Sequence, residues 1–155
     1  MSLDRSGKWN PGGGNYIEVV PAAGVASYLR PSSSSTPVIT LREGFAWTRI
    51  YCTQGTLQYR EVYKDDDQGD LHELDIKGFS PDDSPAKSLS IQNLKQYKRV
   101  LVRFRDNARL TRLAGTPIES LLFTYELGTD AEVGGSRGYN LSFSGPLTEP
   151  AAYAQ

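Results

Sequence analysis

The chain contains one histidine, His72, and one cysteine, Cys52, among its 155 residues. Catalysis at neutral pH draws mainly on these two side-chain types as bases, nucleophiles or metal ligands. A single cysteine also cannot close a disulfide within the chain. The sequence therefore predicts a protein that is not an enzyme and that has no catalytic residue, no metal site and no cofactor.

Long apolar runs and a charged-then-apolar leader are both missing from the sequence. We therefore expect synthesis in the cytoplasm, no export by a standard signal and no membrane span. Seventeen lysines and arginines against eighteen acidic residues leave a net charge of −1. Because a dedicated nucleic-acid-binding protein needs a basic face, we expect only non-adhesive contact with DNA.

The length of the chain fits a single β-rich domain spanning residues 1–155. Three segments lack the pattern of packed structure. Residues 1–15 are glycine-rich with Trp9 as the one aromatic anchor before Asn15, residues 31–37 form a serine tract, and residues 147–155 have no periodicity. We expect a flexible N-terminal arm, an exposed polar loop and an extended C-terminal tail, with both ends disordered in a free subunit and ordered by neighbours.

Alternation of apolar and polar residues, the signature of half-buried strands, dominates the rest of the chain. It is clearest over residues 100–105, 121–127 and 139–144. Residues 47–53 and 56–63 are rich in β-branched and aromatic types around Gln54 and Gly55, which predicts an antiparallel hairpin. A second hairpin turn is expected at residues 106–108.

One helix interrupts this pattern. Ser84 followed by Pro85 is typical of a helix start, and Leu89, Leu94 and Tyr97 suit an amphipathic helix. The sequence thus predicts a mainly β fold: an antiparallel β-sandwich or barrel of about eight strands with one short flanking α-helix.

An acidic run places four carboxylates in six residues, at Asp65, Asp66, Asp67 and Asp70. Calcium favours oxygen-rich loops, but an EF-hand requires glycine at the sixth position and glutamate at the twelfth, where this chain has Asp70 and Ile76. We therefore interpret the run as a solvated hairpin loop.

Other chemical patterns are weaker. In a strand, Glu73 points away from its neighbour His72, so the pair is not arranged for catalysis, and Cys52 fits a core thiol. A hydrolase could use Asp75 with Glu61 or Glu73, although no spacing favours it. Aromatic residues could instead line a sugar-binding face; the candidates are Trp47, Tyr51, Tyr59, Tyr63 and Tyr97.

Basic residues concentrate on one predicted hairpin, at Arg99, Arg103, Arg105, Arg109 and Arg112. Together with the acidic run, this layout suits head-to-tail docking of identical subunits. An ordinary solvated surface of mixed charge explains the same residues equally well.

The order of these features resembles small structural proteins encoded in tail modules of phages and prophages of Bacteroidota. The resemblance covers residues 45–153: a hairpin with an acidic tip (59–71), the segment Gly78-Phe79-Ser80-Pro81 before the helix, a strand ending in Arg105-Asp106-Asn107, and the stretches at 113–117, 138–145 and 149–150.

This resemblance implies a virion component, a tail tube or tail-tube-like ring subunit that forms a homo-oligomeric conduit and has other virion proteins as partners. The expected subunit contacts are Trp9, Asp65, Asp66, Asp67, Asp70, Arg103, Arg105, Arg109 and Tyr153. A carbohydrate-binding or adhesin-like β module is the alternative. It would be a stable monomer with exposed coplanar aromatics, so the assembly state distinguishes the two.

Overall fold

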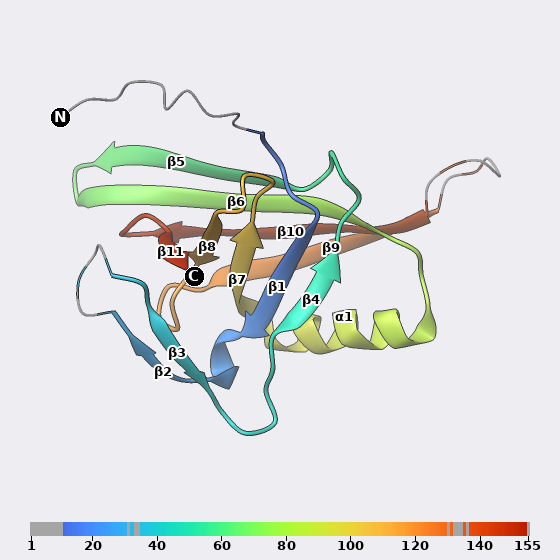
Figure 1. Ribbon diagram of the computed structural model, residues 1–155, viewed down its shortest axis with the longest axis horizontal. Coiled ribbons are helices and arrows are strands. Elements are labelled where there is room, and N and C mark those ends of the chain that lie inside the picture. Colours follow the sequence, from blue (N-terminus) through green and yellow to red (C-terminus); the bar gives the residue numbers. More distant parts are fainter. Residues whose placement is uncertain are drawn as a thin grey trace.

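The computed structural model describes residues 11–30, 32, 35–129, 131, 135 and 137–154. These residues form one α-helix, a short 3-10 turn and eleven strands, all of which pair antiparallel (Figure 1). The fold class predicted from the sequence is therefore confirmed. The elements are β1 (Tyr16–Pro21), η1 (Ala22–Gly24), β2 (Val25–Leu29), β3 (Val38–Leu41), β4 (Thr48–Tyr51), β5 (Gln58–Asp66), β6 (Gly69–Pro81), α1 (Pro85–Tyr97), β7 (Arg99–Arg105), β8 (Thr111–Ala114), β9 (Leu121–Thr129), β10 (Arg137–Leu147) and β11 (Ala152–Ala154).

Strand β7 is the corner of the main sheet. Its first residues pair with β9, its last residues pair with β8, and β1 pairs along its other side. The sheet is thereby divided into two wings, β5-β6-β10-β9 and β11-β8-β7-β1-β4. Strands of the two wings run in clearly different directions in Figure 1, as in a sandwich built by folding one sheet over.

A single large hydrophobic core fills the space between the wings. The alternation predicted for β7, β9 and β10 decides which side chains enter it. Most of their inward residues are buried, whereas Tyr125 is half-buried and Leu127 is exposed; the buried ones are Val100, Val102, Phe104, Leu121, Phe123, Tyr139, Leu141 and Phe143. Each strand therefore turns one face to the core, as a period of two requires.

A smaller apolar cluster covers the outer face of β1 and β7. Leu101 is fully buried there with Val20 and Val25, and the β2–β3 hairpin packs over them. Leu101 alternates with the core residues of β7 and is still buried. The polar loop expected at residues 31–37 joins the two strands of this covering hairpin.

Helix α1 begins as predicted, because the Ser84 side chain accepts a hydrogen bond from the Lys87 backbone N–H at 3.2 Å. Its buried face includes Leu94, as predicted, but otherwise differs from the predicted one. Ile91 and Leu94 enter the core, whereas Leu89 is 66% exposed. The physical reason is helical geometry: Leu89 lies two residues from Ile91, which is about 200° around the helix axis.

The hairpin predicted around Gln54 and Gly55 is wrong. Gly55 does occupy a turn, with a φ of 87°, but β4 pairs with β1 and β5 pairs with β6. At the end of β4 the Thr53 N–H donates to the Phe79 carbonyl oxygen at 2.8 Å. The turn therefore carries the chain from one wing to the other instead of closing a hairpin.

The tail expected to be disordered in a free subunit is part of the fold over residues 147–154. Leu147 ends β10 in the core, and β11 pairs with β8 through Ala152 and Leu113. Ala151 and Ala152 are buried. Small alanine side chains supply little periodic signal, although their burial and backbone pairing hold the segment in place.

The structure describes the predicted N-terminal arm only from residue 11 onward. Residues 1–10, with Trp9, lie outside the described part of the chain. The carbonyl oxygens of Gly12 and Gly13 accept hydrogen bonds from the side chain and backbone of Asn107, at 2.8 and 2.9 Å. Gly14 bridges to Leu57. The flexible arm predicted for residues 1–15 is therefore wrong for residues 12–15.

Candidate functional site

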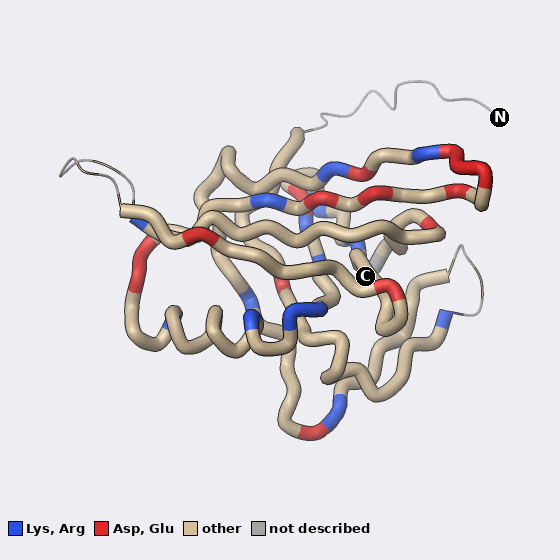
Figure 2. The backbone as a smooth tube through the Cα atoms, turned by 180° about the vertical axis from the view of Figure 1, so that it is seen from behind, with Lys and Arg blue, Asp and Glu red and all other residues tan. Residues whose placement is uncertain are grey.

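The acidic run stands at the end of a long hairpin. Strands β5 and β6 pair from Gln58 opposite Lys77 out to Asp66 opposite Gly69, so the turn is tight and Asp65 and Asp66 lie within β5. We name Asp65, Asp66, Asp67 and Asp70 the acidic tip; all four are exposed. Figure 2 shows acidic residues gathered at this end of the hairpin, at one extreme of the long axis.

One carboxylate of the acidic tip has a hydrogen-bond partner on β5. The Tyr63 hydroxyl donates a 2.8 Å hydrogen bond to Asp70, which raises the pKa of Tyr63, and Lys64 forms a 3.1 Å ion pair with Glu73. Among the residues that the structure describes, no group of three or more histidines, cysteines or acids could hold a metal ion. The four carboxylates are therefore exposed to solvent, and none of them forms an ion pair with a lysine or arginine among the described residues.

Four arginines surround a second surface feature on β1, β4 and β7. We name it the arginine hollow; its volume is about 360 Å³ and it is lined by Tyr16, Glu18, Arg49, Arg103, Arg105, Arg109 and Thr111. The register explains the grouping, because Glu18 lies opposite both Arg49 on β4 and Arg103 on β7. Four positive charges against one carboxylate give this lining a net charge of +3.

Aromatic rings and one ion pair orient the arginines of the hollow. The Arg103 guanidinium lies 4.0 Å from the centre of the Trp47 ring and donates to Glu18 at 3.0 Å. Arg49 lies 4.4 Å from the centre of the Tyr16 ring, and Arg105 donates to the Tyr16 hydroxyl at 3.3 Å. Stacked guanidinium groups lose less side-chain freedom when an anion binds.

The fourth arginine is positioned by a turn. The Asp106 carboxylate accepts a hydrogen bond from the Leu110 backbone N–H at 2.9 Å, and the Asp106 carbonyl accepts from the Arg109 N–H at 3.0 Å. Arg109 has a φ of 68°, the left-handed region that non-glycine residues seldom adopt. The hairpin turn predicted at residues 106–108 is thus confirmed, and it carries Arg109 to the rim of the hollow.

The grouping expected from the sequence is partly wrong. Arg112 pairs with Phe104 in the register, so it projects to the other face of the sheet, where it stacks against Tyr59 and Tyr153. Arg99, at the start of β7, does not line the hollow. Sequence reasoning missed Arg49 and Glu18, since only the pairing of β1 with both β4 and β7 brings them beside Arg103.

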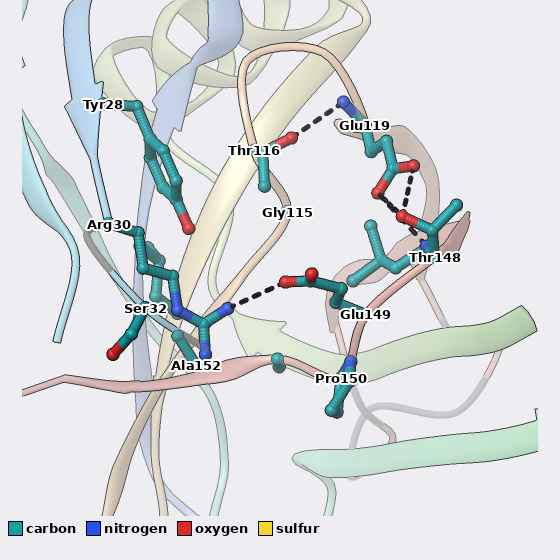
Figure 3. A pocket seen from close by; sticks show the side chains of 13 residues that line it. Tyr28, Arg30, Ser32, Gly115, Thr116, Glu119, Thr148, Glu149, Pro150 and Ala152 are labelled. Carbon is teal, nitrogen blue, oxygen red and sulfur yellow. Dashed lines mark hydrogen bonds and ion pairs between the residues drawn. The ribbon is translucent and has the colours of Figure 1, made fainter. Parts of the chain in front are cut away.

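A pocket of about 420 Å³ lies where β2, the β8–β9 connection and the C-terminal segment meet (Figure 3). Glu119 accepts hydrogen bonds from the backbone N–H and hydroxyl of Thr148, at 3.1 and 2.9 Å, and its own N–H donates to Thr116. Arg30 forms a 3.5 Å ion pair with Glu149. These contacts fasten the C-terminal segment to the sandwich.

The sheet separates one of the two carboxylate pairs considered for a hydrolase. Glu61 lies opposite Leu74 and accepts a 3.0 Å hydrogen bond from the Ala151 N–H, whereas Asp75 on the other face lies 3.4 Å from Lys77. Glu73 lies on the same face as Asp75 and lines the same surface hollow, but its carboxylate forms an ion pair with Lys64, as that of Asp75 does with Lys77. The sheet separates Glu61 from Asp75, so that pair cannot act on one bond.

The lone cysteine and histidine have packing contacts. Cys52 is fully buried, and burial raises the pKa of its thiol to about 11. This matches the predicted core thiol. His72 lies opposite Tyr63, with ring centres 5.5 Å apart.

The aromatic residues do not form one sugar-binding face. Tyr59 packs against the core, where burial raises its pKa, and Arg103 stacks on Trp47. Exposed rings remain at Tyr51, Tyr63 and Tyr97, but they lie on β4, β5 and α1 respectively. Tyr153, an expected subunit contact, is 55% exposed and lies 4.7 Å from Arg112.

Comparisons with known proteins give no match: no protein-family model, no curated protein and no solved structure is significantly similar to the chain. Within the described residues, no helix has both the length and the apolar character needed to cross a bilayer.

Proposed function

We propose that this chain is a structural virion component of a tailed phage, a tail tube or tail-tube-like ring subunit that assembles into a homo-oligomeric conduit. It would be made in the host cytoplasm and incorporated into the virion with other virion proteins. Support comes from the resemblance of residues 45–153 and from one structural observation, the projecting β5–β6 hairpin.

The exposed end of the β5–β6 hairpin has an entropy cost of ordering that an isolated subunit does little to offset. Strand β6 also pairs with β10 as far as His72, so only the end of the hairpin beyond Tyr63 and His72 is two-stranded among the described residues, and from Tyr63 to Asp70 every residue is exposed. Ordering a residue costs about 1–2 kcal/mol of backbone entropy, which exposed side chains do little to offset. An isolated two-stranded hairpin is marginal in water. A neighbouring subunit packed against the hairpin would supply the missing burial.

Strand β5 is also an edge. In the part of the chain that the structure describes, it pairs only with β6. An open edge can pair with another chain, and charges such as those of Lys64, Asp65 and Asp66 limit indiscriminate pairing. This combination favours a specific contact between subunits over general aggregation.

The carbohydrate-binding alternative has weaker support. It requires exposed coplanar rings, and Trp47 is half-buried beneath Arg103.

The near-neutral charge of the chain suits a conduit that DNA passes without adhering.

Light scattering over a concentration series, with electron microscopy of the same samples, tests the proposal. We expect rings or stacked rings that form with increasing protein concentration. A variant in which the hairpin is closed early, by replacing residues 63–72 with a short Asn-Gly turn, should remain folded but monomeric. A strictly monomeric wild-type protein would contradict the proposal.

A further inference from the structure

The acidic tip and the arginine hollow carry opposite charge and lie on separate parts of the molecule. The tip stands at one extreme of the long axis, whereas β1, β4 and β7, which carry the hollow, cross the middle of the molecule (Figure 1). The ladder of β5 with β6 holds the tip there. No ion pair joins the tip to an arginine of the hollow within the described chain.

We propose that the arginine hollow is a carboxylate-binding site, and that its occupant is the acidic tip of a second copy of this chain. This inference rests on the proposed homo-oligomer and names the contact that builds it. It requires only that one subunit present its hairpin to the middle of the next.

The hollow is incompletely satisfied within one chain. Its lining carries a net charge of +3, and Glu18 is the one carboxylate among the lining residues. The buried Nε of Arg103 has no hydrogen-bond partner among the described residues. Like charges held close together repel, so the arrangement is stabilised when an external anion enters.

The tip is a narrow projection. A hairpin end is two strands wide, with about 5 Å between strand axes, so its carboxylates stand at the end of a slender element. Its turn at Asp67 and Gln68 is tight. Arginine is also the cation best suited to a carboxylate, because its planar guanidinium can bind both oxygens.

The contact has a defined symmetry consequence. Tip and hollow are different surfaces, so the contact is heterologous, and a repeated heterologous contact closes into a ring or continues as a filament. A two-fold dimer would need a self-complementary patch instead. Charge pairing would thus set the direction of the contact between subunits, in addition to the burial that the hairpin gains against its neighbour.

Charge reversal tests the contact. One variant carries Asp65→Lys and Asp66→Lys, a second carries Arg105→Glu and Arg109→Glu, and a third carries all four changes. Lys95→Glu with Arg99→Glu is the matched control, since both residues are exposed and outside the hollow. Circular dichroism and thermal melting verify folding of each variant.

Each reversal alone should raise the concentration for half-assembly at least about tenfold. The four-change variant should assemble at a lower concentration than the Arg105→Glu, Arg109→Glu variant, because its tip is neutral where that variant presents a fully negative tip to a negative hollow. The two reversed proteins, mixed, should co-assemble, and high salt should weaken wild-type assembly. A wild type that never assembles overturns the proposed function. Assembly unchanged by the reversals, or a four-change variant that assembles no better than the Arg105→Glu, Arg109→Glu variant, overturns the docking contact and leaves the proposed function standing.

A nucleic-acid ligand is the competing outcome. Fluorescence anisotropy with a labelled DNA duplex distinguishes it, because the near-neutral chain with its acidic tip should bind DNA no better in the wild type than in the Arg105→Glu, Arg109→Glu variant. Duplex binding that is lost in that variant while assembly persists would assign the hollow to phosphate and overturn the proposal.

Discussion

The Glu61 carboxylate accepts a 3.0 Å hydrogen bond from the backbone N–H of Ala151, ninety residues later in the chain. Glu61 lies on β5, and Ala151 directly precedes β11. One side chain thus connects the hairpin wing to the C-terminal strand of the other wing. Sequence reasoning considered Glu61 as a hydrolytic acid, whereas the structure uses it as a backbone acceptor.

Replacing Glu61 by alanine should lower the free energy of unfolding by about 1–3 kcal/mol, because the Ala151 N–H loses its partner in a partly buried place. Glu61→Gln keeps an acceptor oxygen and should cost less. Urea unfolding measures the difference, and hydrogen exchange should quicken at the amides of β11. Exposed Glu43, changed to alanine, serves as the control. Equal stability of wild type and Glu61→Ala would show that the contact does not fasten the tail.

A cross-strand glycine pair offers a matched test of packing. Gly138 on β10 lies opposite Gly128 on β9. A Cβ on Gly138 would come within 2.3 Å of the Ser80 carbonyl oxygen, whereas a Cβ on Gly128 meets nothing within 4 Å. Gly138→Ala should therefore destabilise the fold by about 1–3 kcal/mol, and Gly128→Ala should be neutral or slightly stabilising. Thermal melting decides, and similar melting temperatures for the two variants would refute the packing argument.

The Cys52 thiol should be unreactive in the native protein. It is fully buried, and its pKa is raised to about 11 from 9.0, so it remains protonated at pH 8. Alkylation with iodoacetamide should be slow in the folded state and fast in guanidinium chloride. Rapid native labelling would mean that this part of the core opens readily.

The raised pKa of the Cys52 thiol predicts that the free energy of unfolding depends on pH. Between pH 9 and pH 11 the unfolded chain loses the thiol proton while the folded chain keeps it, so stability falls as pH rises through this window. Relative to Cys52→Ala, the wild type should lose up to about 1.4 kcal/mol per pH unit there, measured by urea unfolding. A constant difference between the two proteins across the window would contradict the shift.

Calcium should not stabilise the acidic tip. Its four carboxylates are exposed, and the described residues contain no cluster suited to a metal ion. Replacing Asp65, Asp66 and Asp67 by asparagine should leave the melting temperature nearly unchanged. A calcium-induced rise in the melting temperature of the wild type, abolished by the three substitutions, would identify the tip as a calcium site.

The sequence by itself determined the elements whose signal is local. Alternation in residues 100–105 or 139–144 assigns faces to a strand because its side-chain period is two. Ser84 before Pro85 starts the helix through contacts within one turn. The acidic hairpin and the turn at residues 106–108 follow from equally local chemistry.

Only the tertiary structure decided which strands become neighbours. A turn at Gln54 and Gly55 is compatible with pairing of β4 and β5, but in the structure β4 pairs with β1 and β5 pairs with β6. Which pairing forms depends on how the two wings bury their apolar faces against each other. The alanines before and within β11 are placed by a partner strand, β8, far away in sequence. The arginine hollow arises in the same way, since Arg49, Glu18 and Arg103 meet only through the register of three strands, and no short segment of the chain records that register.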